Sequence, residues 1–75
     1  MEIRDVFARN LKAGRQAKGM TQEELAHRAE LDRTYVSALE RSVYSATIDI
    51  VERLAAALGV EACELLKRSP KNLAD

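Results

Sequence analysis

The sequence predicts an all-α protein: a compact five-helix bundle with a helix-turn-helix at its centre. Apolar residues recur at helical spacing along most of the 75 residues. The few glycine and proline residues fall mainly where one such helical segment ends and the next begins. A chain of this length has room for one hydrophobic core. We therefore expect a single domain over residues 1–75, with the helix-turn-helix at about 21–41 and a frayed tail at about 69–75.

The first helix is expected from Ile3 to Ala17, with Gly19 as its stop. Its apolar residues follow the i, i+3, i+4 spacing of a stripe that faces a core. They are Ile3, Val6, Phe7 and Leu11.

The second helix is expected to begin after Thr21, because Glu24 stands three residues later and completes a capping box. Its buried face is formed by small and apolar residues, namely Leu25, Ala26 and Ala29. A break around Glu30 and Leu31 ends it, and Asp32 is placed to cap the third helix.

The third helix should separate an inner from an outer face. The residues expected to turn inward are Leu31, Tyr35, Val36 and Leu39. The residues expected to remain outside are Arg33, Thr34, Ser37, Ala38 and Arg41.

The fourth helix is expected to begin at the cap Thr47 and to end at Gly59 in the left-handed conformation that glycine tolerates. Its buried side is predicted to hold Ile48, Val51, Leu54, Ala55 and Leu58. A fifth helix should run from about Ala62 to Arg68, carry Leu65 and Leu66, and stop before Pro70.

Composition argues against several classes of protein. Cys63 has no second cysteine with which to form an internal disulfide, and with only His27 beside it we expect neither a metal site nor a cofactor. No apolar run approaches the roughly 18 residues of a membrane span, and residues 1–5 are too charged to begin a signal peptide. We expect a cytoplasmic protein without a membrane partner.

Charge is balanced overall but unevenly distributed. Twelve lysines and arginines offset twelve acidic residues, yet the stretch from Arg9 to Lys18 holds four basic residues and no acidic one. A nucleic-acid binder usually carries a basic surplus. If the helix-turn-helix reads DNA, its nonspecific affinity should be weak, and binding must depend on dimerisation and base contacts.

Three segments, GMTQEELA, LDRTYVSALER and IDIVERLAAALGV, resemble the repressor and Cro-like helix-turn-helix family, often called XRE. The resemblance covers about residues 7–68. Within the family, LDRTY and the short chain are similar to controller proteins of restriction-modification systems. The resemblance implies a homodimeric transcription regulator on a pseudo-palindromic, double-stranded DNA operator, with the third helix in each major groove. Activation through RNA polymerase and repression by blocking it both remain open.

On this resemblance, Arg33 is expected to present two donors to the O6 and N7 of a guanine. Thr34 and Ser37 would contact neighbouring base edges through a hydroxyl or a methyl group and so adjust which sequence is preferred. Ala38 would contribute only through its shape against the DNA. The alternative for Arg33 is a solvated side chain in the first turn of a helix.

The remaining expected contacts go to phosphates, which position the protein rather than specify sequence. These residues are Gln22, Tyr35, Tyr44, Ser45, Thr47, Arg41 and Lys18. The alternatives are that Gln22 is an ordinary helix former, Tyr35 a core residue, and Tyr44 a cover for the fourth helix. Arg15 and Glu40 match the family's buried ion pair between the first and third helices.

Three positions depart from the family pattern. Glu30 takes the turn position that usually holds glycine, so a left-handed backbone there would cost about 1 kcal/mol or somewhat more. Gly14 replaces a large aliphatic residue, with a loss of about 1 kcal/mol in helix propensity. Glu61 stands at the start of the fifth helix where serine or proline is typical.

Dimerisation is expected through an apolar patch of the last two helices, formed by Ile50, Cys63 and Leu66. His27 is expected to be a surface helix residue, and the alternative for Cys63 is a small buried or half-buried hydrophobe. A rival function is an antitoxin or anti-repressor partner that uses the same fold to hold another protein. Enzyme activity is not expected, since no nucleophile or carboxylate accompanies His27 in a catalytic arrangement.

Overall fold

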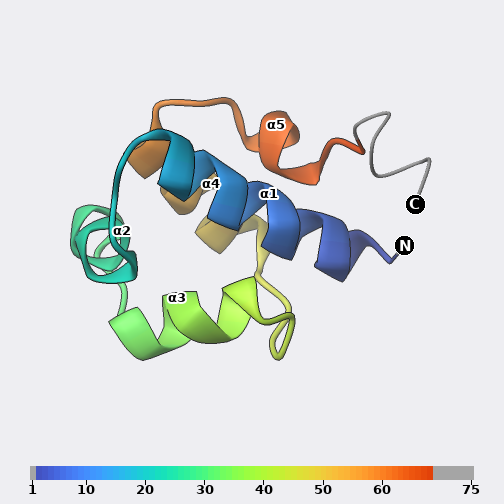
Figure 1. Ribbon diagram of the computed structural model, residues 1–75. Coiled ribbons are helices and arrows are strands. Elements are labelled where there is room, and N and C mark those ends of the chain that lie inside the picture. The colour runs from blue at the N-terminus through green and yellow to red at the C-terminus, as the bar shows by residue number, and fades with distance from the viewer. Residues whose placement is uncertain (1, 69–75) are drawn as a thin grey trace.

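The computed structural model describes residues 2–68, and within them the chain is entirely helical apart from turns and loops. The described elements are α1 (Ile3–Ala17), α2 (Gln22–Ala29), α3 (Arg33–Glu40), α4 (Ile48–Leu58) and α5 (Ala62–Leu66) (Figure 1). The all-α, five-helix prediction is confirmed. The expected tail at 69–75 and the stop at Pro70 lie outside the described residues.

Helices α1 and α4 each pack against three other helices. Helix α1 packs against α3, α4 and α5, α4 also packs against α2 and α5, and α2 packs against α3. Figure 1 shows α3 along one edge of the molecule and α5 on the opposite side of α1. The outer side of α3 is therefore left free of any other described helix.

The core is built from the apolar faces that the sequence predicts, with two exceptions. The fully buried large side chains come from α1 to α4: Leu11, Leu25, Leu39, Leu54, Leu58, Val6 and Val36. The predictions for Ile3 and Ile48 are wrong, because these side chains are 48% and 86% exposed. Each is the first residue of its helix, so its side chain lies beyond the neighbouring helices that cover the rest of the stripe.

Two of the three predicted helix starts are capped as expected. The Thr21 hydroxyl accepts from the Glu24 amide at 3.0 Å, and the Glu24 carboxylate accepts from the Thr21 amide at 3.1 Å. The Thr47 hydroxyl accepts from the Ile50 amide at 3.1 Å. Asp32 occupies the N-cap position of α3, but its side chain makes no capping hydrogen bond. The start of α3 thus depends on its packing more than on its cap.

Helices α1 to α4 all end in one motif, in which a left-handed residue follows the last turn. These residues are Gly19, Glu30, Ser42 and Gly59. Glu30 has φ 58° and Ser42 has φ 61°, so both bear a side chain where glycine is unstrained. At Glu30 the expectation of a left-handed turn is confirmed, and the following amide, Leu31 N, donates to Ala26 O at 2.8 Å.

The predicted ion pair between α1 and α3 is present and nearly closed to water. Arg15 Nε lies 2.7 Å from Glu40 Oε2 and Arg15 Nη2 lies 3.0 Å from Glu40 Oε1. The side chains are 12% and 3% exposed. Hydrogen bonding to Glu40 raises the pKa of Arg15 above its ordinary value, against the opposing effect of burial. Arg15 Nη1 also donates to Met20 O at 2.7 Å, which ties the turn before α2 to the same pair.

Gly14 marks the close approach of α1 and α4. A Cβ atom at this position would lie 3.3 Å from Leu58 Cδ1. The Leu58 side chain, 2% exposed, therefore fills the place where a larger residue of α1 would pack. The small residue and the large one opposite it are complementary.

Helix α5 is shorter than expected and ends at Leu66, because Lys67 has extended backbone angles (φ −82°, ψ 128°). The side-chain amide of Asn10 donates to the carbonyl oxygens of Leu65 at 3.0 Å and Lys67 at 2.9 Å. These bonds satisfy carbonyl groups that the end of a helix leaves without a partner. They fasten α5 to α1.

Replacing Arg15 with methionine should lower the free energy of unfolding by about 3 to 5 kcal/mol, because Glu40 would remain buried without its cation. Urea unfolding followed by circular dichroism measures the change. Lys12→Met, at an exposed position of the same helix, is the matched control and should change stability by less than about 0.5 kcal/mol. The double variant Arg15→Met/Glu40→Leu should recover part of the loss. Equal effects of Arg15→Met and Lys12→Met would contradict this account.

Replacing Glu30 with glycine should raise the free energy of unfolding by about 1 kcal/mol, because glycine adopts φ 58° without steric strain. The same denaturation experiment measures it. Glu30→Ala removes the same charge but retains a Cβ atom, so it should bring no such gain. If the alanine and glycine variants gained equally, charge rather than backbone strain would be the cause.

Candidate nucleic-acid interface

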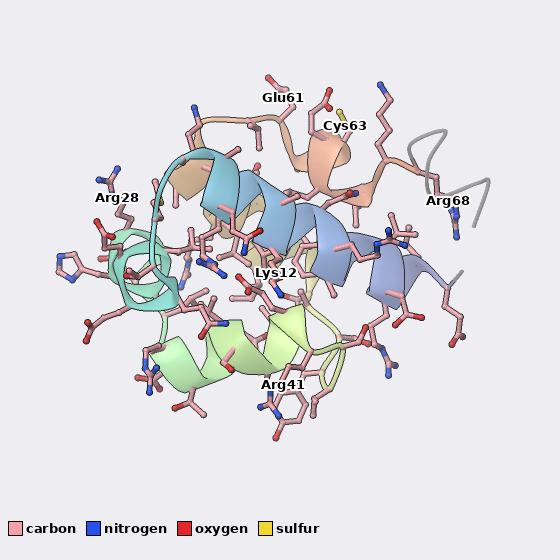
Figure 2. All side chains as sticks on the ribbon, in the orientation of Figure 1. Lys12, Arg28, Arg41, Glu61, Cys63 and Arg68 are labelled. Atoms are coloured by element: carbon pink, nitrogen blue, oxygen red, sulfur yellow. The ribbon has the colours of Figure 1, made fainter. Side chains whose placement is uncertain are left out.

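The outer face of α3 carries most of the polar side chains that the sequence places there. Arg33 and Thr34 are exposed in the first turn, Ser37 is half-buried, and Arg41 is exposed at the end of the helix. Arg41 Nε lies 3.4 Å from Ser37 O, and Figure 2 shows the Arg41 side chain directed away from the bundle. The outer face of α3 therefore presents hydrogen-bond donors on two long side chains, Arg33 and Arg41, and on two short ones, those of Thr34 and Ser37.

The prediction that Ala38 lies on this outer face is wrong. Its side chain is only 3% exposed. Val43 N donates to Ala38 O at 2.9 Å, which is the backbone bond that closes the end of α3. Ala38 follows Tyr35 by three residues and so stands at the border between the inner and outer faces, and the tertiary fold buries it.

The first turns of α2 and α3 border an open groove of about 600 Å³. Its lining residues are Arg15, Thr21, Gln22, Glu23 and Arg33. The tertiary fold thus brings together Gln22 and Arg33, two residues that the sequence analysis assigned to different kinds of DNA contact. Free amides and the positive end of the helix dipole make the start of a helix favourable for an anion.

The side chain of Gln22 has a role that the sequence did not indicate. Gln22 Nε2 donates to Glu40 Oε1 at 3.1 Å. Glu40 therefore accepts from Arg15 of α1 and from Gln22 of α2, so one carboxylate of α3 joins three helices. The angle at which α3 is presented depends on this carboxylate.

The loop between α3 and α4 lies beside the same surface. The rings of Tyr35 and Tyr44 are 6.4 Å apart between centroids and inclined at 34°. Tyr35 is half-buried and packs on the core, while Tyr44 is 57% exposed. Ser45 and Thr47 are exposed as well, although the Thr47 hydroxyl already accepts from the Ile50 amide. The structure therefore places Tyr44 against Tyr35 of α3, while Ser45 borders a small pocket with Ile3, Arg4 and Phe7 of α1.

One residue pair at this surface was missed by the sequence analysis. Ser42 Oγ donates to Asp5 Oδ1 at 2.6 Å and so connects the loop to the first turn of α1. The two residues are 37 positions apart. The only available signal was a serine directly after the end of α3, in a place where glycine is common.

The basic residues between Arg9 and Lys18 serve two different purposes, an ion pair inside the protein and positive charge at its surface. Arg15 is committed to Glu40, whereas Lys12 and Lys18 are exposed, and Figure 2 shows Lys12 on α1. Lys18 occupies the C-cap position of α1. It is therefore available as a surface cation close in sequence to the start of α2.

The expected dimer residues lie in different environments. Cys63 is exposed on α5, on the opposite side of the molecule from α3 (Figure 2), so a buried cysteine is ruled out. Leu66 is 39% exposed. Ile50 is half-buried and packs against the core. His27 is exposed as expected. Over residues 2–68 no three potential metal-binding side chains cluster, and no helix there has the length and apolar character of a membrane span.

Comparisons with known proteins give the family. The family profile described as "Helix-turn-helix" matches residues 11–65. A hypothetical transcription factor of Neisseria meningitidis serogroup B is 49% identical over 65 residues, which are 87% of this chain and 61% of that protein, so the chain spans less than two thirds of that relative's length. Control protein C.BamHI of Bacillus amyloliquefaciens is 38% identical over 85% of this chain and 80% of its own length.

Solved structures agree with these relatives. The crystal structure of the hypothetical transcription factor NHTF from Neisseria superposes with a TM-score of 0.88 at 45% identity, over 97% of this chain and 83% of that one. The restriction-modification controller protein C.Esp1396I, solved as a tetramer in complex with its natural 35 base-pair operator, gives a TM-score of 0.78 at 35% identity, over 89% and 99% of the two chains. The chain therefore belongs to the XRE-type helix-turn-helix family, with restriction-modification controller proteins among its homologues.

Proposed function

We propose that this protein is a sequence-specific, DNA-binding transcription regulator that binds a pseudo-palindromic operator as a homodimer. The third helix of each copy lies in the major groove of one half-site, about 34 Å from its symmetry mate. Within the family, the function is that of a restriction-modification controller. Its action is binding rather than catalysis, and it takes place in the cytoplasm.

The observation that carries this proposal is the free polar face of α3. Arg33 and Thr34 project from its first turn, while Val36 and Leu39 on the other side are fully buried. A helix held in this way can enter the major groove with its polar side against the base edges. The guanidinium of Arg33, in the first turn, fits the paired acceptors of a guanine better than the hydroxyls of Thr34 and Ser37 do.

Phosphate contacts are proposed on both sides of α3. On one side the groove contains Thr21, Gln22 and Arg33. On the other side the loop presents Tyr44, Ser45 and Thr47. Contacts of this kind fix the register of a protein on the duplex without reading its sequence.

Two relatives support the controller assignment. C.BamHI is a control protein by name, and C.Esp1396I was solved with its natural operator. We propose that this chain binds at the promoter of its own gene. It would regulate transcription there either by contacting RNA polymerase or by excluding it. A balanced charge of twelve basic and twelve acidic residues makes a single copy a weak binder, so dimerisation is part of the mechanism.

The direct experiment is selection of bound duplexes from a random library, followed by footprinting of the promoter upstream of the gene. The expected result is one inverted repeat, recovered by selection and protected in the promoter. Recovery of duplexes without any shared sequence would contradict a sequence-specific regulator.

Arg33→Ala should weaken binding to the selected operator by about 1 to 3 kcal/mol and leave binding to random DNA nearly unchanged, because a bidentate base contact is lost. Lys18→Ala should weaken both by similar amounts, since a phosphate contact carries no sequence information. Fluorescence anisotropy titrations at one fixed salt concentration measure both. Equal losses on the two DNAs for Arg33→Ala would mean that Arg33 contacts phosphate only.

Leu66→Asp should shift the protein toward monomer and raise the dimer dissociation constant about tenfold or more, because a charge would enter an apolar interface. Sedimentation equilibrium measures mass against the 8.4 kDa of one chain. Val60→Asp, at a position of nearly equal exposure (38% against 39%), is the control and should remain dimeric. A wild-type protein that sediments as a monomer at micromolar concentration would remove dimerisation from the proposal.

A further inference from the structure

We propose that Asp5 and Ser42 form a positioning pair, which holds the loop of residues 42–47 in the shape that contacts the DNA backbone. The proposal rests on the proposed function, because it assigns to the first turn of α1 a part in that same interface. Neither residue needs to touch DNA. The pair acts through the loop.

The bond between them has the geometry of a strong hydrogen bond. Ser42 Oγ lies 2.6 Å from Asp5 Oδ1, within the range of a hydroxyl that donates to a carboxylate. Both residues are partly shielded from water, which strengthens the bond relative to one on an open surface. In Figure 1 the loop after α3 lies at the same end of the molecule as the first turn of α1.

The backbone at Ser42 shows that a side chain is retained there at a cost. The equivalent residue after α1 is Gly19 and after α4 is Gly59, both at positive φ without strain. Ser42 adopts φ 61° with a Cβ atom, as Glu30 does after α2. The difference is that Ser42 uses its side chain to reach a distant helix, whereas the Glu30 side chain is exposed. Backbone strain that persists at such a point is evidence for a functional constraint.

Ala46 in the second half of the loop packs against the core, whereas the first half has few attachments besides the bond to Asp5. Ser42 N and Val43 N donate to Leu39 O and Ala38 O at 3.2 and 2.9 Å, which only closes α3. The ring of Tyr44 lies against Tyr35. The bond to Asp5 links the start of the loop to the first turn of α1. Without it, the entropy of ordering the loop must be lost when DNA binds.

The test compares four variants in which stability and DNA binding should separate. Ser42→Gly removes the hydroxyl but also the backbone strain, so its unfolding free energy should stay near that of the wild type. Ser42→Ala removes the hydroxyl and retains the strain, so it should be less stable. Asp5→Ala removes the acceptor, whereas Asp5→Asn retains an oxygen that can accept from the hydroxyl.

The expected result is a loss of about 5- to 10-fold in affinity for the selected operator in Ser42→Gly, Ser42→Ala and Asp5→Ala. The loss should be the same on random DNA, because loop contacts go to phosphates. The dependence of affinity on salt should stay unchanged in the Ser42 variants, since residues 42–47 include no charged side chain. Asp5→Asn should bind like the wild type or more tightly. The double variant Asp5→Ala/Ser42→Ala should be no weaker than either single variant, since one bond is lost in all three.

A charge control is needed because Asp5→Ala also removes a negative charge beside DNA. Glu2→Ala removes an exposed carboxylate from the start of the same helix and leaves the Ser42 bond intact, so it should not weaken binding. If Ser42→Gly bound the operator within twofold of the wild type, the positioning role would be overturned. Affinity that followed stability across the variants would overturn it as well, since it would show a merely structural bond.

Failure of this proposal is distinguishable from failure of the proposed function. A wild-type protein that selects no DNA contradicts the function itself and overturns the positioning pair with it. A wild-type protein that binds its operator while all four variants bind equally well contradicts the positioning pair alone. Amide hydrogen exchange in the free protein gives an independent check, because residues 43–47 should exchange faster in Ser42→Ala than in the wild type.

Discussion

The carboxylate of Glu40 is the point on which the presentation of α3 depends. It accepts hydrogen bonds from Arg15 on α1 and Gln22 on α2, and Arg15 in turn binds the carbonyl of Met20 before α2. With Glu40 only 3% exposed, these polar groups exclude other arrangements of the helices. No buried side-chain polar atom among residues 2–68 lacks a hydrogen-bond partner. The core contributes most of the stability, while this network orients the polar face of α3.

The ends of α2 and α3 share a second constraint. Both helices close with a left-handed residue that bears a side chain, Glu30 and Ser42, while α1 and α4 close with glycine. Among residues 2–68, side chains at positive φ are therefore confined to the two turns that flank α3. At Ser42 a hydrogen bond to Asp5 accompanies the strain, and at Glu30 the side chain is exposed. A short chain with a small core tolerates such costs only where the geometry of the turn is required.

The distribution of charge is consistent with a regulator that binds weakly as one copy. Arg15, one of four basic residues in the basic stretch of α1, is used inside the protein, while Lys12 and Lys18 remain at the surface. The side chains on the outer face of α3 are few and short apart from Arg33 and Arg41. Affinity must then come from symmetry and from the precision with which each α3 is held, because nonspecific attraction to phosphates is limited.

The sequence by itself determined the helices, their caps at Thr21 and Thr47, and the exposed Arg33, because these follow from local periodicity and from hydrogen bonds between residues three apart. The Arg15–Glu40 pair came from the family resemblance. Tertiary structure decided whatever depends on elements distant in sequence. Ala38 is buried, the first residues of α1 and α4 are exposed, and Ser42 meets a carboxylate 37 residues away. Helical spacing specifies the direction of a side chain but not which distant segment will cover or bind it.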